Sequence, residues 1–187
     1  LGRSRCCTLV RAVCGGICSA LSSLPAALVH LRPVPVLRML FLSVAFYGMA
    51  TFEGPVMSVK AVNALSHYTN WTVGHVHSGA LGWVGYVSFG AIYCLVPWLW
   101  NKKLYSLKLV NWHFWISTVG IVLYITSMWV SGILQGLMWR AYTSLGFLEY
   151  SFVETVEALP PSYAIRALGG SLCPAVPLVT VWHCWNS

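Results

Sequence analysis

The stretch GHVHSGALGW, residues 74–83, places two histidines one residue apart at the start of an apolar run from His75 to Leu99. A run of this length is long enough to cross a bilayer as a helix. Ionisable side chains inside a membrane usually mark a functional site, and imidazole is the commonest metal ligand among side chains. The pair therefore predicts a metal or haem centre within a membrane protein.

The composition favours a membrane protein, because 58% of the 187 residues are hydrophobic, 8% are charged and none is Asp. Soluble domains carry about 25% charged residues. The net charge of +7 raises the question of nucleic acid, but the Lys and Arg residues are scattered between apolar segments and form no basic stripe. The sequence therefore predicts membrane lipid as the surrounding and no nucleic-acid partner.

Three apolar runs satisfy the length of about 20 residues that a bilayer span requires. They are Met39 to Val59, His75 to Leu99 and Val110 to Met138. A fourth run, around Tyr163 to Trp185, is interrupted by two prolines. The predicted fold is an all-α membrane protein with three to four transmembrane helices that form part of a larger bundle.

Basic residues predict the orientation of these spans. Arg32 and Arg38 precede the first span, and three lysines between residues 102 and 108 link the second span to the third. By the positive-inside rule these segments face the cytoplasm. The loop around His67 and the acidic segment 149–157 are then expected on the outer side.

The two ends of the chain differ in character from its middle. Residues 1–38 are rich in Arg, Ser and Cys and contain no acidic residue, and the tail 171–187 is equally atypical. A transit or signal peptide is one interpretation of the first segment. The favoured interpretation is that both ends are products of a frame error or a truncated gene, so the membrane domain is expected at residues 39–170.

The spacing of the two histidines limits what they bind. Successive residues of an α-helix rotate by about 100°, so His75 and His77 project about 200° apart, on nearly opposite sides, and cannot chelate one metal ion. Two large planar cofactors, one on each side and each bound through its iron, satisfy this geometry. No C-x-x-C-H attachment signature is present. The alternative is a pair of interfacial imidazoles hydrogen-bonded to backbone or water.

Two glycines follow the pair on the face of the first histidine. Gly79 and Gly82 lie four and seven residues after His75, where missing side chains allow a macrocycle or another helix to approach. Close packing of helices through small residues explains the same spacing equally well. The spacing of the glycines alone does not distinguish the approach of a macrocycle from close helix packing.

Several long stretches, from about Phe46 to Gly170, resemble one known family. They are FYGMATFEGPVMSVKAVNALSHYTNWTVGHVHSGALGWVGYVSFGAIYCLVP, LYSLKLVNWHFW, SMWVSGILQGLMWRAY and FLEYSFVETVEALPP. These stretches are similar to the C-terminal part of the catalytic subunit, subunit I, of haem-copper oxidases of the cbb3 type. They cover about two thirds of this chain, but only about a third of such a subunit.

The resemblance implies a role for each histidine of the pair. His75 corresponds to the axial ligand of the high-spin haem b3, where oxygen binds, and His77 to one of the two axial ligands of the low-spin haem b. Electrons would cross the helix from the His77 side to the His75 side. Such an oxidase reduces O2 to water with electrons from cytochrome c and pumps protons in the bacterial inner membrane. Its c-type cytochrome subunits and the remaining helices of subunit I are then the expected partners.

The resemblance also implies roles for neighbouring polar residues. Glu53, in the FEGP motif, would accept the Nδ1 proton of His75 and raise the basicity of that ligand; a protonated Glu that caps a local backbone group is the alternative. His67 and Asn63 resemble the residues around the haem propionates, with a solvated loop as the alternative for Asn63. Tyr47 is expected to serve in packing, and His113 is expected in an interfacial belt.

The family's oxygen-reducing centre needs further ligands. Three histidines for copper B and a second axial histidine for haem b lie on earlier helices of the family, upstream of every stretch matched here, so no copper ligand is expected in this chain and the fragment alone is expected to be inactive. One alternative is a fragment of nitric oxide reductase, of the same superfamily. Another is a non-functional membrane remnant that lacks the copper site.

Overall fold

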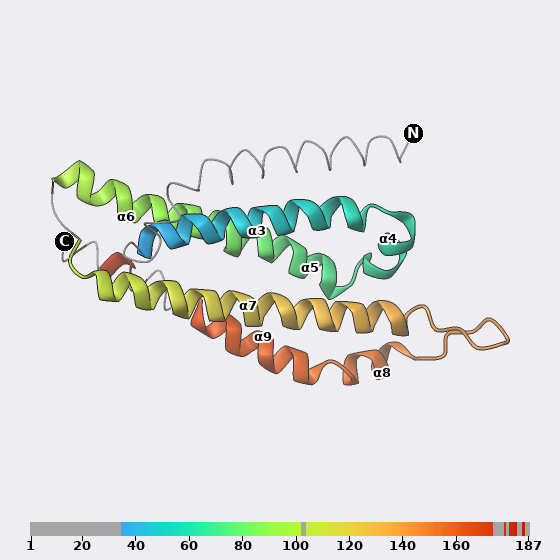
Figure 1. Ribbon diagram of the computed structural model, residues 1–187. Coiled ribbons are helices and arrows are strands. Elements are labelled where there is room, and N and C mark those ends of the chain that lie inside the picture. Colours follow the sequence, from blue (N-terminus) through green and yellow to red (C-terminus); the bar gives the residue numbers. More distant parts are fainter. Residues whose placement is uncertain (1–34, 102–103, 174–177, 179, 183–184, 186–187) are drawn as a thin grey trace.

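The computed structural model describes residues 35–101, 104–173, 178, 180–182 and 185. In this part of the chain the structure is helical, and the pairing nearest to a sheet is one isolated bridge between Tyr142 and Leu148. Three helical spans are long and apolar enough to cross a membrane: Pro35–Met57, Asn70–Trp100 and Leu107–Met138. They run lengthwise beside one another (Figure 1). The predicted all-α membrane fold is confirmed.

The first span is α3, Pro35–Met57, and a short helix, α4, Lys60–Ser66, follows it. The predicted start at Met39 was late, since proline is well suited to the first turn of a helix, where its missing N–H is not needed. One face of α3 packs against the second span, with Met39 and Phe46 buried in the core.

The second span consists of three segments in direct succession: α5, Asn70–His77; η1, Ser78–Gly85; and α6, Tyr86–Trp100. The η1 segment is a π-helix. The span begins at Asn70 rather than at His75, because the side chain of Thr69 caps the helix by accepting a hydrogen bond from the N–H of Trp71. The histidine pair therefore lies inside the span, more than one turn from its start.

The third span, α7, Leu107–Met138, packs against α3, α4, α5, η1 and α9. The sequence Gly132-Ile-Leu-Gln-Gly136 on this helix has the small-residue spacing that lets membrane helices approach closely. A Cβ atom on Gly132 would overlap the backbone nitrogen of Trp71, and one on Gly136 would overlap the carbonyl oxygen of Leu65. Gly132 therefore lets the start of the second span lie directly on α7, and Gly136 does the same for α4.

The remaining described helices are α8, Phe152–Glu157, and α9, Pro160–Leu172. Ser151 and Glu154 form a capping box at the start of α8, and α9 packs along α7, where Gly120 meets Gly169. The predicted fourth span, Tyr163 to Trp185, falls partly outside the described residues. The described helix in this region is α9, whose 13 residues begin at Pro160, before the predicted start at Tyr163.

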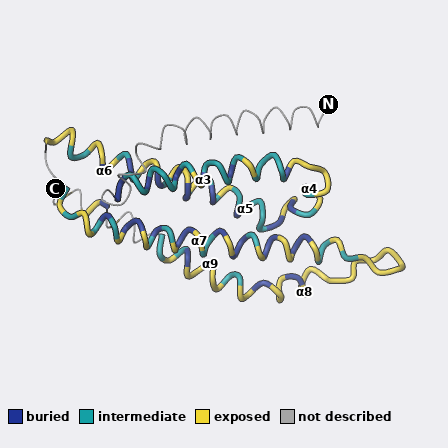
Figure 2. Tube along the Cα trace, viewed as in Figure 1, coloured by how far each residue is buried: buried dark blue, intermediate teal, exposed yellow. Residues whose placement is uncertain are grey.

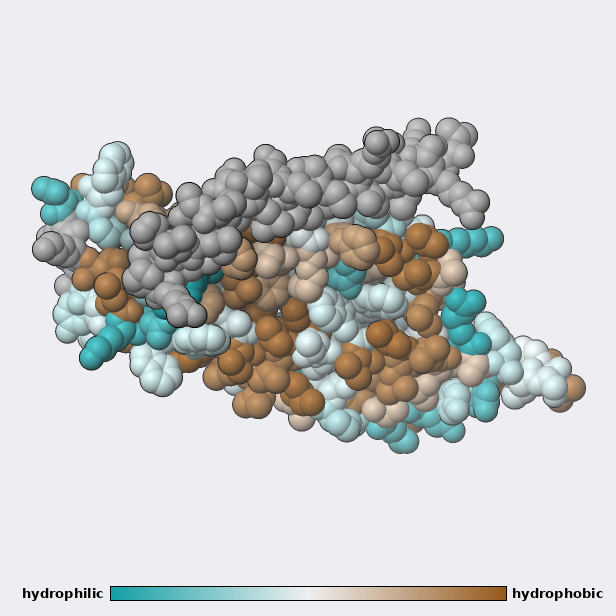
Figure 3. Space-filling view, viewed as in Figure 1, coloured by the Kyte–Doolittle hydropathy of each residue, from teal (hydrophilic) through white to brown (hydrophobic). Residues whose placement is uncertain are grey.

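The end of α6 and the start of α7 lie at one end of the bundle, and α4 and the segment before α8 lie at the other (Figure 1). The orientation of these two ends in the membrane stays a prediction. Exposed positions occur along the spans as well as at the ends (Figure 2), and many of them are large hydrophobic side chains. Hydrophobic residues cover the middle of the face shown in Figure 3, and hydrophilic residues gather toward its ends. This distribution suits a surface in contact with lipid or with further helices.

A substitution at Gly132 of α7 tests this packing. We expect Gly132→Ala to destabilise the chain by about 1–3 kcal/mol, the usual cost of overpacking, because the added methyl group overlaps the Trp71 backbone. The measurement is the thermal unfolding midpoint of the chain in detergent. Gly85→Ala is the matched control, since a Cβ there meets its nearest neighbour, the carbonyl oxygen of Ala80, at an ordinary 3.7 Å. Equal unfolding midpoints for the two variants would contradict close packing of the Trp71 backbone against Gly132.

Candidate functional site

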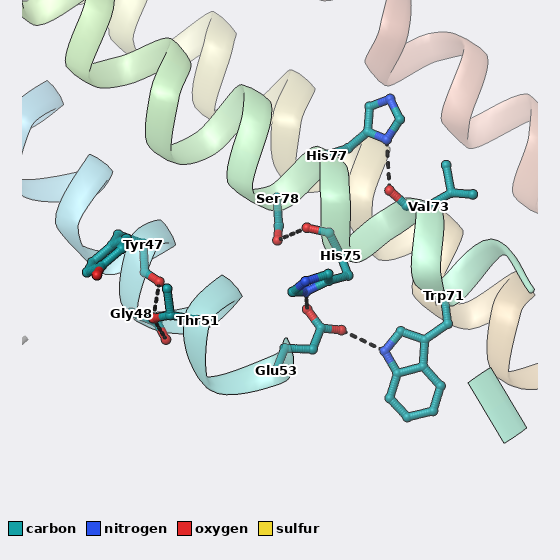
Figure 4. Close-up of polar contacts among 9 residues, drawn as sticks. All are labelled: Tyr47, Gly48, Thr51, Glu53, Trp71, Val73, His75, His77 and Ser78. Carbon is teal, nitrogen blue, oxygen red and sulfur yellow. Dashed lines mark hydrogen bonds and ion pairs between the residues drawn. The ribbon is translucent and has the colours of Figure 1, made fainter. Parts of the chain in front are cut away.

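His75 and Glu53 meet across the contact between α5 and α3. The Nδ1 atom of His75 lies 3.2 Å from Oε2 of Glu53 (Figure 4). The side chain of Glu53 is 13% exposed, so most of it is buried between the helices. With Oε2 as the acceptor of this hydrogen bond, Nδ1 carries the proton and Nε2 keeps its lone pair.

The other oxygen of the same carboxylate is also engaged. The indole N–H of Trp71 donates to Oε1 of Glu53 at 2.6 Å (Figure 4). Trp71 and His75 are four residues apart in α5 and share one face of the helix. Trp71 was missed in the sequence analysis, although this spacing from a candidate ligand was a usable signal.

A groove of about 590 Å³ runs between α3 and the second span, and His75 is part of its wall. The other lining residues are mostly small or apolar, namely Ala50, Thr51, Gly54, Pro55, Ser58, Val76, Gly79, Ala80, Trp83 and Val84. A Cβ on Gly54 would lie 3.7 Å from Nε2 of His75. The absence of a side chain at Gly54 therefore keeps this nitrogen accessible from the groove.

His77 faces the opposite side of the same helix. Its Nδ1 donates to the carbonyl oxygen of Val73 at 2.8 Å, and its ring lies 5.2 Å from that of Tyr124 on α7. Figure 4 shows the two imidazoles pointing away from each other. The predicted opposite orientation is confirmed. A hydrogen bond from His77 to the backbone is also what the alternative of interfacial imidazoles predicts. The same bond fixes the tautomer of His77 in which Nε2 has a lone pair.

The π-helix η1 starts directly after His77. In a π-helix each N–H bonds five residues back rather than four, and such segments are frequent at functional sites. Ser78 is the first residue of the π-helix, and its hydroxyl donates a hydrogen bond to the carbonyl oxygen of His75 at 2.7 Å. The wider turn displaces the rest of the span relative to the histidine pair, which the sequence pattern did not predict.

The two glycines after the pair serve different purposes. Gly79 lines the groove together with His75, as the hypothesis of an approaching macrocycle requires. A Cβ on Gly82 would overlap the ring of Phe46 in α3, so this glycine permits helix packing.

Other candidate residues lie away from this groove. Asn63 in α4 and His67 at its C-terminal cap are exposed, and neither lines the groove beside His75. Tyr47 packs its ring against Trp83 at 4.6 Å, in accord with the expected packing role.

Comparison with known proteins decides the family. Residues 8–172 match the family described as cytochrome C and quinol oxidase polypeptide I. This chain belongs to that family. The matched range includes most of the atypical segment 1–38, whose origin stays a prediction.

Curated oxidase subunits resemble the chain closely. It is 71% identical over 172 residues to the cytochrome c oxidase subunit 1 homolog, bacteroid, of Bradyrhizobium diazoefficiens, covering 91% of the chain and 31% of that relative. It is 67% identical over 170 residues to the subunit 1 homolog of Azorhizobium caulinodans, covering 90% and 31%. It is 53% identical over 174 residues to the cbb3-type cytochrome c oxidase subunit CcoN1 of Stutzerimonas stutzeri, covering 92% and 37%. The chain spans about a third of the length of these relatives.

His113 of this oxidase chain is not the belt residue that its neighbours predicted. The belt prediction was wrong because His113 is buried in the core, 1% exposed, whereas Trp112 and Trp115 on either side are exposed. Its Nδ1 lies 2.7 Å from the hydroxyl of Tyr93 and 3.3 Å from that of Thr180.

Two further histidines, His30 and His183, lie outside the described residues. Within the described part of the chain, no group of three or more His, Cys, Asp or Glu residues is placed to hold a metal ion.

The buried pair formed by His113 and Tyr93 gives a testable prediction. We expect Tyr93→Phe to lower stability by about 1–3 kcal/mol, because it removes a hydrogen-bond partner from a buried polar group. Thermal unfolding in detergent measures the change. Tyr142→Phe, at a position 62% exposed, is the control and should leave the midpoint unchanged. If the Tyr93 variant behaves like this control, the hydrogen bond does not contribute to stability.

Proposed function

We propose that this chain is the part of the catalytic subunit of a cbb3-type cytochrome c oxidase that provides axial histidines to two haems. His75 is assigned to the high-spin haem b3 and His77 to the low-spin haem b. The complete oxidase would reduce O2 to water with electrons from cytochrome c and pump protons across the bacterial inner membrane. Membership of the oxidase family supports this, as does the name of the Stutzerimonas stutzeri relative, which states the cbb3 type.

One observation carries the proposal: the two imidazoles lie on opposite faces of one helix, and each uses Nδ1 for a hydrogen bond within the protein. This leaves Nε2 of each ring with a lone pair directed away from the other ring. A ligating histidine in proteins almost always donates its other ring N–H to a carboxylate or a backbone carbonyl. His75 has the first kind of partner and His77 the second.

The groove beside His75 fits a large planar group. Its volume of about 590 Å³ and apolar lining lie within the range of small-molecule and cofactor sites. Larger side chains at Gly54 or Gly79 would narrow the approach to His75. The residues present therefore suit a haem held through its iron and by apolar contact.

A bound haem supplies the redox chemistry, and the chain's residues control its ligation. Glu53 holds the proton on Nδ1 of His75 and gives the ring partial imidazolate character, which strengthens Nε2 as a donor. At His77 the neutral Val73 carbonyl is a weaker acceptor than a carboxylate. Nε2 of His75, whose ring bonds to Glu53, is therefore the stronger electron-pair donor to iron, and Nε2 of His77 is the weaker one.

The remaining parts of the proposed centre belong to the rest of the subunit. The second axial ligand of haem b, the ligands of copper B and the contacts with c-type cytochrome subunits are assigned to segments outside this chain, which spans 31% of the Bradyrhizobium relative. His67 and Asn63 are proposed to serve the haem propionates from the exposed end of the span.

Haem loading of the chain tests the assignment of the two histidines. We expect the chain in detergent to bind up to two b-type haems in a five-coordinate state, and His75→Leu or His77→Leu each to remove about half of them. Haem content per chain and reduced-minus-oxidised spectra measure this. Tyr142→Phe, at an exposed position outside the groove, keeps both axial candidates and should retain five-coordinate haem. A six-coordinate signal from the unaltered chain, or loading that neither leucine variant reduces, would contradict the assignment.

The role of Glu53 has a separate spectroscopic test. We expect Glu53→Gln to lower the iron–histidine stretching frequency of the ferrous haem on His75, because a neutral amide is a weaker acceptor than a carboxylate. Resonance Raman spectroscopy measures the frequency. Thr51→Val is the control in the same groove, since the Thr51 hydroxyl bonds the carbonyl oxygen of Tyr47 at 2.6 Å and not the carboxylate. An unchanged frequency in the Gln variant contradicts the role.

A further inference from the structure

The carboxylate of Glu53 is held by two donors from one turn of α5. Nδ1 of His75 lies 3.2 Å from Oε2, and the indole nitrogen of Trp71 lies 2.6 Å from Oε1. The contact with the indole is the shorter of the two. At 2.6 Å it is shorter than the usual range of N–H···O hydrogen bonds, so the indole and the carboxylate are closely engaged.

Two donors constrain a carboxylate in a way that one does not. With His75 as the sole partner, the carboxylate of Glu53 could rotate about its terminal torsion, which is broad and roughly two-fold in carboxylate side chains. A second donor on the other oxygen fixes this rotation.

The indole is itself fixed by α7. The backbone of Trp71 lies against Gly132, where no Cβ intervenes. The preceding residue, Asn70, donates its N–H to Oε1 of Gln135 at 2.8 Å and its side-chain amide to the hydroxyl of Ser131 at 3.1 Å. Three contacts with one face of α7 thus hold the backbone from which the indole projects.

We propose that Trp71 is a positioning residue that holds the Glu53 carboxylate toward His75 and so sets the strength of His75 as a ligand. The chain of contacts runs from α7 through Asn70 and Trp71 to Glu53, and from there to Nδ1 of His75. Its effect on a bound haem rests on the proposed function. The hydrogen bond from Trp71 to Glu53 and its effect on the carboxylate do not depend on that function.

A second tryptophan provides a matched control. Trp129 of α7 lines a neighbouring pocket together with Glu53 and Trp71. Among the described residues, its buried Nε1 atom has no hydrogen-bond partner. Replacing either tryptophan with Phe removes one indole from the same region, but only Trp71→Phe removes a hydrogen bond to the carboxylate.

The first test uses the chain without haem. Indole N–H resonances of the ¹⁵N-labelled chain in detergent are recorded, and Trp71→Phe identifies the signal of Trp71 by its loss. We expect this proton far downfield, and Glu53→Gln to move it upfield, whereas Trp129→Phe leaves it in place. If Glu53→Gln does not move the Trp71 signal, the hydrogen bond does not form and the proposal is wrong.

The second test uses the haem-loaded chain. We expect Trp71→Phe to shift the iron–histidine stretching frequency in the same direction as Glu53→Gln but by less. The double variant should match Glu53→Gln alone, because both substitutions act through one carboxylate. Trp129→Phe should retain the original frequency. A frequency unaffected by Trp71→Phe, or shifts that add in the double variant, would overturn the positioning role.

The two tests separate this proposal from the proposed function. If no haem binds to His75, the haem assignment fails, while the indole resonance still decides whether Trp71 holds Glu53. If haem binds and Glu53→Gln shifts the frequency while Trp71→Phe does not, the function stands and the role of Trp71 is refuted.

Discussion

The Glu53 carboxylate between α3 and α5 is the constraint on which the site depends. A charge in an apolar environment persists only with hydrogen-bond donors around it, and both donors here, Trp71 and His75, come from one helix face. To bring them to one carboxylate, α5 must lie against α3 at a fixed height and rotation. Gly132 of α7 lets α5 pack closely on the other side. The imidazole of His75 is consequently oriented by three spans, although only one of them carries it.

The change from α-helix to π-helix after His77 separates two tasks of the second span. Before the change, α5 is held by polar contacts with α3 and α7, which position the histidines. After it, η1 and α6 pack against α3 through apolar contacts, with Gly82 against Phe46 and Gly90 against Leu40, while the hydroxyls of Tyr86 and Tyr93 bond to side chains of α7. A regular α-helix would keep one register throughout the span. The π-helix η1 changes the register of the part of the span that follows His77, while His75 and His77 keep their contacts with α3 and α7.

Hydropathy and helical rotation predicted much of this fold from the sequence. The three spans follow from runs of apolar residues, and the opposite directions of His75 and His77 follow from 100° per residue. Contacts between spans were harder to predict, because they depend on which faces meet. His113 looked interfacial from its tryptophan neighbours, yet its own face points to Tyr93. The hydrogen bond of Trp71 and the π segment likewise arise from packing that the local sequence does not encode.

The two sides of the histidine helix are covered to different degrees. The ring of His77 lies against Tyr124 of α7, whereas the described residues that line the groove at His75 come from α3, Ser58 and the second span. A planar macrocycle has two faces, and the imidazole of His75 approaches only one of them. In the proposed function, the other face would be covered by segments of the subunit outside this chain, which spans about a third of the length of its relatives. The exposed apolar side chains along the spans are the surface on which such segments would pack. The part of the subunit seen here thus fixes the proximal side of the proposed haem, and the chemistry at its open side depends on the remainder.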